Sequence, residues 1–133
     1  MKTTLIETFD VSVDELFKVV SDLDNFQWRS DLSNVHVLED QRYFQEVSLK
    51  GQISECEITE FILNERYVVV KKSKNTRETC DMKFGIDKKG KSLIIIEDEL
   101  IVLNPIIKFL SAGLFDNEKL VKAYLHDLKK RFK

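Results

Sequence analysis

A long stretch of alternating apolar and polar residues is the feature that most limits how this chain can fold. From residue 34 to residue 103, apolar side chains tend to recur at every second position, and short turn-forming segments interrupt the pattern. A period of two places successive side chains on opposite faces of a strand, and closely spaced strands with short turns form an antiparallel meander. The pattern predicts six strands, near residues 34–39, 42–49, 52–63, 66–73, 76–87 and 91–103.

Two further elements precede this run of strands. The segment "KTTLIETF", residues 2–9, predicts a first strand, and "VSVDELFKVVSDL", residues 11–23, predicts a short helix. Ser12 and Glu15 have the spacing of a capping box, in which each side chain satisfies a free backbone N–H at the helix start. Leu16 begins the apolar face of this helix.

The C-terminal segment predicts one long helix. Asn104 is a favourable N-cap, and Pro105 stands at the first helical position, where its missing N–H has no consequence. Helical spacing places Gly113 and Asn117 in the middle of one broad apolar stripe and His126 on the opposite face. The stripe, which indicates a single large partner surface, consists of Ile106, Ile107, Leu110, Leu114, Val121, Tyr124, Leu125, Leu128 and Phe132.

The order of these elements predicts an α+β fold. A strand, a short helical segment, six strands and one long helix cannot form a doubly wound sheet. They can form a seven-stranded curved antiparallel sheet wrapped around the long C-terminal helix, and the 133 residues suffice for one domain, 1–133. Such a sheet, held away from a helix by bulky side chains, encloses a cavity of the kind that binds small molecules.

The turns between strands predict which side chains face the helix. The segment "DKKGK" is typical of a three-residue turn with Gly90 in the left-handed conformation. This turn places Cys80 opposite Asp98, so Asp98 faces inward with Met82 and Phe84. A register shifted by one residue would instead place Glu97 and Glu99 inside. A two-residue "KN" turn then pairs Val69 with Cys80, Tyr67 with Met82 and Lys71 with Glu78. The alternative register pairs Lys72 with Glu78, so a lysine faces that glutamate in either case.

The remaining two turns complete the expected interior. A two-residue "NE" turn would set Ile62 opposite Tyr67 and bring Glu60 inward, followed by Ile58 and Cys56. A two-residue "KG" turn would bring Tyr43, Gln45 and Val47 to the same face. The interior is therefore mostly apolar with a few polar groups, the general pattern of a small-molecule site: Tyr43, Gln45, Glu60, Tyr67, Asp98 and Asn117. Alternatively, these groups pair with one another or reach water at the cavity mouth.

The charge of the chain is distributed unevenly. The formal net charge is −2, yet residues 1–65 carry 5 Lys or Arg against 14 Asp or Glu, and residues 66–91 carry 9 against 3. A basic stretch could bind nucleic acid. If the acidic and basic segments are neighbouring strands, however, their charges pair across the sheet, and we favour this interpretation and expect no nucleic-acid partner.

The segment "FDVSVDELFKVVSDLDNFQWRSDLSNVHVLE", residues 9–39, resembles the START/Bet v 1-like superfamily and, within it, the polyketide cyclase/dehydrase-like proteins. Ser12, Glu15, Asp22, Phe26 and Trp28 match the helix start, the helix end, the aromatic residue and the Trp of that pattern. Relatives often have prolines beside the Trp that this chain lacks. The resemblance implies a helix-grip fold with a hydrophobic cavity whose members bind or process lipids, sterols, polyketides and related molecules. Related members resemble quinone-binding proteins or chaperone activators.

The sequence favours binding over catalysis. The chain has no G-x-S-x-G, P-loop, H-E-x-x-H or C-x-x-C motif, and two histidines and two cysteines predict neither a metal site nor a cofactor. General acid–base chemistry of a cyclase or dehydratase type stays open, because Asp98 or Glu60 in an apolar cavity would have a raised pKa. A carboxylate held by Tyr67, Tyr43 or Lys71 for structural reasons is the alternative.

We therefore expect a cytoplasmic protein that binds a small hydrophobic or amphipathic molecule of lipid, polyketide or aromatic type. The N-terminus has no signal peptide, the two cysteines are expected to be reduced, and no apolar run is long enough for membrane insertion. The expected ligand contacts are Trp28, Tyr43, Tyr67, Met82, Phe84, Asp98, Leu110, Gly113, Leu114 and Asn117. Trp28 is expected to pack inward and close one end of the cavity. A co-chaperone-like interaction module is a second alternative, and the chain could be a monomer or a homodimer.

Overall fold

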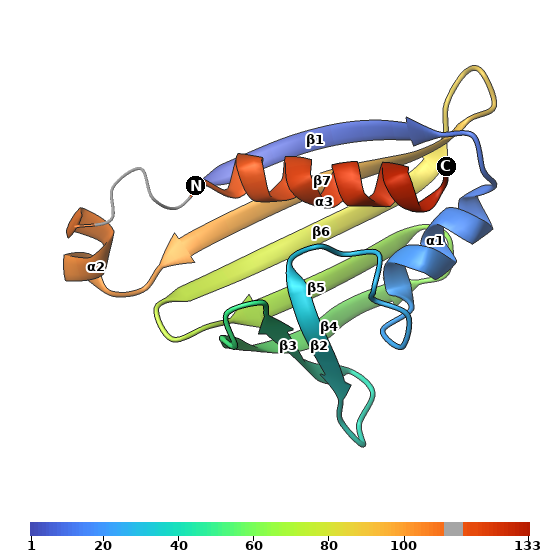
Figure 1. Cartoon of the computed structure of the whole chain (residues 1–133). Helices are drawn as coiled ribbons and strands as arrows, with labels where there is room; N and C mark the ends of the chain where they lie inside the picture. Colours follow the sequence, from blue (N-terminus) through green and yellow to red (C-terminus); the bar gives the residue numbers. More distant parts are fainter. Residues whose placement is uncertain (111–115) are drawn as a thin grey trace.

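Seven antiparallel strands form one continuous sheet that curves around a C-terminal helix (Figure 1). The structure is a computed structural model and describes residues 1–110 and 116–133. The strands are β1 (Lys2–Phe9), β2 (Leu32–Val37), β3 (Tyr43–Ser48), β4 (Ile53–Ile62), β5 (Arg66–Lys72), β6 (Thr76–Ile86) and β7 (Ser92–Val102), in the spatial order β1-β7-β6-β5-β4-β3-β2. The helices are α1 (Val13–Ser21), α2 (Pro105–Leu110) and α3 (Asn117–Arg131). These elements confirm the α+β class and the seven-stranded sheet.

The β6–β7 hairpin has the register that its turn predicts. Gly90 has φ +81°, in the left-handed region that favours glycine, and the Asp87 N–H donates to the Lys91 carbonyl oxygen over 2.8 Å. Cys80 lies opposite Asp98, Met82 opposite Ile96 and Phe84 opposite Ile94. The β5–β6 pairs Val69–Cys80, Tyr67–Met82 and Lys71–Glu78 are confirmed as well.

The prediction for β3 was wrong by one residue. The Ser48 N–H donates to the Gln52 carbonyl oxygen over 2.9 Å, so the turn before β4 contains three residues and ends at Gly51, with φ +81°. One extra turn residue moves every β3 side chain to the other face. Phe44 and Glu46 are therefore buried, whereas the expected inward residues Tyr43, Gln45 and Val47 lie on the outer face.

The inward position of Glu60 was also wrong. The turn between β4 and β5 has three residues, with Asn64 at φ 61°, and it pairs Phe61 rather than Ile62 with Tyr67. Glu60 then lies opposite Val68 and faces outward. A β-bulge between Ile58 and Glu60 restores the alternation, so the expected inward positions of Ile58 and Cys56 are confirmed.

The expected single C-terminal helix is interrupted. Asn104 caps α2 as predicted, because its Oδ1 accepts from the Ile106 N–H over 2.9 Å. Asp116, however, has extended dihedral angles of φ −131° and ψ 92°, and its Oδ1 accepts from the Lys119 N–H over 3.1 Å, so it begins a new helix. An Asp side chain that satisfies a free N–H is a strong helix start. Ile106, expected to face the sheet, is 70% exposed.

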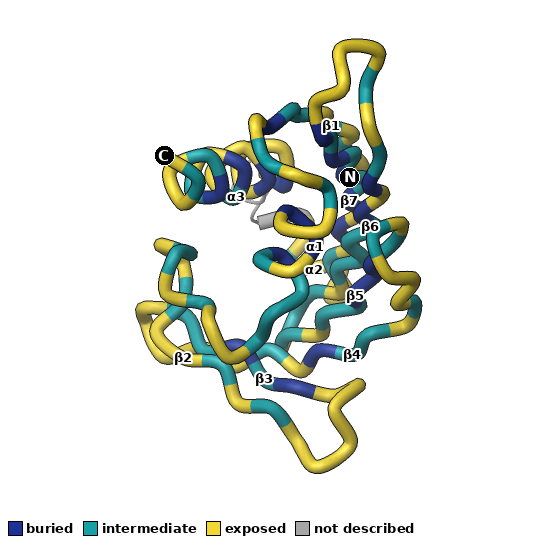
Figure 2. Tube along the Cα trace, turned by 90° about the vertical axis from the view of Figure 1, so that its right-hand side faces the viewer, coloured by how far each residue is buried: buried dark blue, intermediate teal, exposed yellow. Residues whose placement is uncertain are grey.

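The core lies between the sheet and the two helices α1 and α3. The predicted stripe of α3 is confirmed at Val121, Leu125 and Leu128, which are buried, and α1 contributes Leu16 and Phe17. Figure 2 shows the buried segments of these helices gathered on the side that faces the sheet. Within the described residues, no helix combines the length and the apolar character needed to cross a membrane.

The charged strands pair with one another as expected. On the outer face, Arg66 of β5 and Asp81 of β6 form an ion pair of 2.8 Å, and Lys83 of β6 lies 3.9 Å from Glu97 of β7. Exposed pairs of this kind contribute little stability individually. They do account for the basic character of residues 66–91, which lie between acidic neighbours in the sheet.

Replacing Leu128 by Ala should destabilise the protein by about 3 kcal/mol, because a fully buried leucine leaves a cavity when it is truncated. Leu120 on the same helix is 55% exposed and provides the matched control, for which we expect a loss well below about 1 kcal/mol. Urea unfolding of both variants measures the difference. Equal losses would contradict the packing of α3 described here.

Candidate functional site

A cavity of about 160 Å³ lies between the inner face of the sheet, the segment that follows α1, and α3. One part of its wall is apolar and consists of Val20, Leu23, Phe44, Val69, Met82, Ile96, Leu120, Val121 and Ala123. The other part carries polar and charged side chains: Arg29, Ser30, Asp31, Glu46, Tyr67, Lys71, Glu78, Cys80, Asp98, Tyr124 and Asp127. The cavity is therefore amphipathic.

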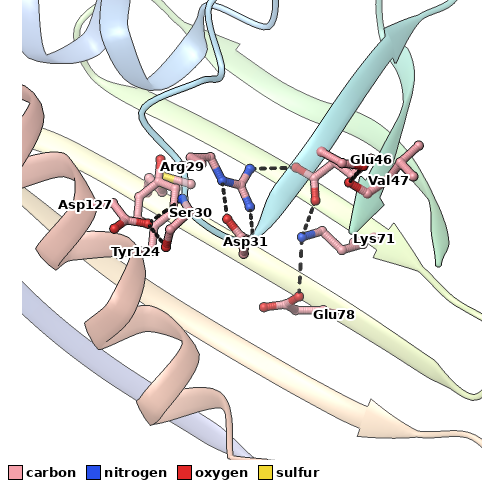
Figure 3. A network of polar contacts seen from close by, with 11 residues as sticks. Arg29, Ser30, Asp31, Glu46, Val47, Lys71, Glu78, Tyr124 and Asp127 are labelled. Atoms are coloured by element: carbon pink, nitrogen blue, oxygen red, sulfur yellow. Dashed lines mark hydrogen bonds and ion pairs between the residues drawn. The ribbon is translucent and has the colours of Figure 1, made fainter. Parts of the chain in front are cut away.

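A buried carboxylate connects two cations in this wall (Figure 3). Glu46 Oε2 accepts from Arg29 Nη1 over 2.7 Å, and Glu46 Oε1 accepts from Lys71 Nζ over 2.5 Å. Burial alone would raise the pKa of Glu46, but the positive charges of Lys71 and Arg29 outweigh it and lower the pKa to about 2. Glu46 is consequently ionised at neutral pH, and its charge is matched on both oxygens.

Both cations keep their charge despite burial. Arg29 also binds Asp31 through two bonds, Nε to Oδ1 at 3.2 Å and Nη2 to Oδ2 at 2.8 Å, and it lies over the Tyr124 ring. Burial acts to lower the pKa of Arg29, but Glu46 and Asp31 more than offset this and raise it. The pKa of Lys71 follows the same balance, with burial opposed chiefly by Glu46.

The segment after α1 is attached to α3 at the edge of the cavity. The backbone N–H and the Oγ of Ser30 both donate to Asp127 Oδ2, over 2.8 and 2.7 Å. Trp28 contacts the Tyr124 ring edge to face at 5.2 Å and packs against the core. Trp28 thus packs inward, as expected, although the cavity lining does not include it.

Asp98 also belongs to the polar wall and is fully buried. Its Oδ1 accepts from Asn117 Nδ2 over 3.2 Å, whereas its Oδ2 has no hydrogen-bond partner among the described residues. Burial, followed by the neighbouring Glu78 carboxylate, raises the pKa of Asp98 to about 8. The Asp98 carboxyl group therefore holds a proton at neutral pH.

Three of the expected ligand contacts line the cavity, and two others are buried outside its lining. Tyr67, Met82 and Asp98 line the cavity together. Phe84 is buried in the core against Phe17, with ring centroids 4.9 Å apart, outside the cavity lining. The Asn117 side-chain amide donates hydrogen bonds to the carbonyl oxygen and Oδ1 of Asp98.

The other expected contacts are not part of the cavity as described. Tyr43 is 37% exposed on the outer face of β3, where it contacts Arg42, and the catalytic candidate Glu60 faces outward on β4. Gly113 and Leu114 lie outside the described residues, as does the side chain of Leu110.

Sequence reasoning missed six charged residues of the polar wall: Arg29, Asp31, Glu46, Lys71, Glu78 and Asp127. Lys71 and Glu78 were paired correctly, and because they share the face of Val69 and Cys80 the alternation already placed them inside. Glu46 was missed because the turn that ends at Gly51 has one residue more than predicted. No alternation covers Arg29, which precedes β2, so no comparable signal existed for it.

Replacing Asp98 by Asn should flatten the pH dependence of stability. The pKa of an unfolded Asp is about 3.9, and the folded value is about 8. The folded state therefore holds an extra proton between these values, and stability falls as the pH rises through that window. Between about pH 5 and about pH 7, the free energy of unfolding of the variant should increase relative to that of the wild type by about 1 kcal/mol per pH unit.

Urea unfolding at both pH values measures this gain. Glu99→Gln, at an exposed position on the same strand, is the matched control. Its free energy of unfolding should differ from that of the wild type by the same amount at both pH values. A constant difference for Asp98→Asn as well would show that its carboxyl group titrates normally.

Comparison with known proteins relates the chain to others by its fold. No protein-family model matches the chain, and no curated protein matches it either. A START superfamily protein from Mycobacterium smegmatis has a TM-score of 0.78 at 11% identity, over 98% of this chain and 96% of that protein. A hypothetical protein from Helicobacter pylori has a TM-score of 0.76 at 13% identity, over 99% of this chain and 86% of that protein. The protein XoxI from Bacillus cereus has a TM-score of 0.75 at 13% identity, over 98% of this chain and 94% of that protein. These similarities confirm that the chain has the START/Bet v 1-like helix-grip fold.

Proposed function

We propose that this protein binds a small amphipathic organic molecule in the cavity between the sheet and α3. The single observation that carries the proposal is a pair of buried polar atoms in the cavity wall, Tyr67 Oη and Asp98 Oδ2, which have no hydrogen-bond partner among the described residues. Buried polar groups without partners are uncommon, because each one loses its hydration without compensation. A ligand with polar atoms at these positions would supply the missing bonds.

The size of the cavity narrows the class of ligand. A cavity of about 150 Å³ lined by apolar side chains accommodates a benzene molecule, and the present cavity measures about 160 Å³. One aromatic ring with a short polar substituent matches this volume. Of the lipid, polyketide and aromatic ligands expected from the sequence, a single-ring aromatic compound is the best fit.

The fold supports the same proposal at a coarser level. Proteins with the START fold commonly bind hydrophobic ligands between sheet and helix. In this chain the corresponding space is lined in part by Phe44, Met82 and Val121, which provide contact area for a ring. Tyr67 and Asp98 would select for the polar end of the ligand.

Saturating concentrations of a single-ring aromatic ligand should raise the melting temperature of the 133-residue chain by several degrees, because a ligand at 100 times its Kd stabilises a protein by about 2.7 kcal/mol. Native mass spectrometry of the same sample should show one bound molecule. A panel of substituted phenols, aryl amines, aryl ketones and aryl acids provides the probes. If no member of the panel raises the melting temperature or adds mass, the proposal is wrong.

A blocking variant tests the location. Ala123 is an exposed residue at the margin of the cavity, and Ala123→Phe should abolish the stabilisation by any ligand that the wild type binds. Lys122→Phe adds the same ring at the neighbouring position, which does not line the cavity, and should leave the stabilisation intact. Equal ligand responses of the two variants would place the ligand elsewhere.

Proton transfer on a bound molecule is a second candidate function. Asp98 is a protonated acid at neutral pH beside Glu78, and both line the cavity. In a β-hydroxy ketone, the Glu78 carboxylate could remove a proton from the carbon next to the carbonyl group. Asp98 could give its proton to the leaving hydroxyl group, so that water and an unsaturated ketone would form.

Deuterium exchange tests this second candidate without knowledge of the substrate. With 4-phenyl-2-butanone in D₂O, the protein should accelerate exchange of the protons next to the carbonyl group, as followed by NMR. Asp98→Asn and Glu78→Gln should each abolish the acceleration, and Glu99→Gln should not. Exchange at the uncatalysed rate in the presence of the wild type would reject the candidate.

A further inference from the structure

The cavity wall carries more negative than positive groups. Among the described residues that line it, five are acidic and two are basic: Asp31, Glu46, Glu78, Asp98, Asp127, Arg29 and Lys71. Residues 109–115 have no charged side chain in the sequence, so they do not alter this balance. With Asp98 protonated, the wall has a net charge of −2.

The two cations are already bound to other acidic groups. Arg29 binds Glu46 at 2.7 Å and Asp31 at 2.8 Å, and Lys71 binds Glu46 at 2.5 Å. Asp127 accepts two hydrogen bonds from Ser30. The positive charges of Arg29 and Lys71 are therefore already offset by Glu46 and Asp31, and neither cation offers an unmatched charge to the carboxylate of a ligand.

Among the described residues of the wall, Glu78, Asp98 and Asp127 have no cation within hydrogen-bonding distance, and Asp127 is bound by Ser30 instead. Glu78 Oε1 lies 3.9 Å from Lys71 Nζ, a distance too long for a hydrogen bond, and Asp98 Oδ2 has no partner among the described residues. The register explains why the two carboxyl groups meet. Cys80 lies opposite Asp98, so Glu78, two positions along β6, shares the inner face diagonally across from Asp98.

A second unpartnered group lies elsewhere in the wall. Tyr67 is 2% exposed and lines the cavity, and its Oη has no hydrogen-bond partner among the described residues. Phe44 and Tyr124 add aromatic surface to the same lining. The wall thus combines a carboxyl pair, an aromatic surface and a separate hydroxyl group.

We propose that the Glu78–Asp98 carboxyl pair binds the ammonium group of a small aryl-alkyl amine. This inference rests on the proposed function and names the ligand class. An ammonium group has three donors and no acceptor, so it can bind Glu78 and the free Asp98 Oδ2 together. The ring then packs against the aromatic surface, and Tyr67 Oη binds a polar substituent on the ring.

The protonation of Asp98 is consistent with this assignment. Two carboxyl groups held close together retain one proton, because both cannot be ionised without strong repulsion. A ligand cation replaces that proton. The groups that face Asp98 are Glu78 and Cys80 from β6, Lys71 from β5 and Asn117 from α3, and among these Glu78 and Lys71 carry charge.

Three probes of similar shape test the proposal by isothermal titration on the 133-residue chain. Tyramine carries an ammonium group, tyrosol carries a neutral hydroxyl group at the same position, and 3-(4-hydroxyphenyl)propionate carries a carboxylate. Tyramine should bind at least about tenfold more tightly than tyrosol, as expected for a charge-assisted hydrogen bond. The carboxylate should bind most weakly.

The pH dependence and two variants locate the ammonium group. Tyramine affinity should rise between about pH 6 and about pH 8, because binding releases the Asp98 proton and the amine itself stays charged up to about pH 10. In Asp98→Asn and in Glu78→Gln, the ratio of tyramine to tyrosol affinity should fall toward one. In Glu99→Gln, which removes the same charge from an exposed position on β7, the ratio should not change.

The possible outcomes separate this inference from the proposed function. If tyrosol binds as tightly as tyramine, or if the carboxylate binds best, the ammonium assignment is wrong and the proposed function stands. If none of the three probes binds and the wider aromatic panel also fails, both are wrong. Preserved selectivity in both folded variants would overturn the assignment to Glu78 and Asp98.

Discussion

The buried carboxylate of Glu46 is the interaction on which the polar half of the cavity depends. It binds Arg29 from the segment after α1 and Lys71 from β5, and it lies on β3 between them. Two cations in a buried position would be costly without it, since loss of one partner from a buried pair destabilises a protein by about 3 to 5 kcal/mol. Glu46 thereby joins three separate parts of the chain at one point.

This ion-pair cluster also decides what the cavity can receive. Because Glu46 and Asp31 offset both cations, this cluster has no surplus positive charge for a ligand. The acidic groups outnumber them, and Glu78, Asp98 and Asp127 have no cation within hydrogen-bonding distance among the described residues. The same residues that hold the segment after α1 in place therefore give the cavity its preference for a cation over an anion.

The sequence was sufficient for the general fold and for part of the site. The β6–β7 hairpin was predictable, because Gly90 specifies its turn and the alternation on β6 specifies its inner face, so Tyr67, Met82 and Asp98 were correctly placed. The turns at Gly51 and Asn64 admit two or three residues with similar sequences. Each contains three, and the extra residue moved Glu46 into the cavity and Glu60 out of it.

The interrupted C-terminal helix shows how a local preference can override a helical pattern. The apolar spacing runs through residue 116 without a break, but Asp116 has a side chain that caps a helix well and thereby competes with continuation. The cap at Asp116 makes Asn117 the first residue of α3. The Asn117 amide donates to the Asp98 carbonyl oxygen at 3.0 Å and to Asp98 Oδ1 at 3.2 Å.

The position of Asn117 in turn defines the chemistry of Asp98. One carboxyl oxygen is bound to the helix start, which fixes the orientation of the side chain on β7. The other oxygen, Oδ2, has no partner among the described residues of the cavity wall, which also contains Glu78. Burial there favours the protonated form of the Asp98 carboxyl group. A helix cap, which is a local feature of the C-terminal segment, thus determines which atom of a sheet residue can meet a ligand.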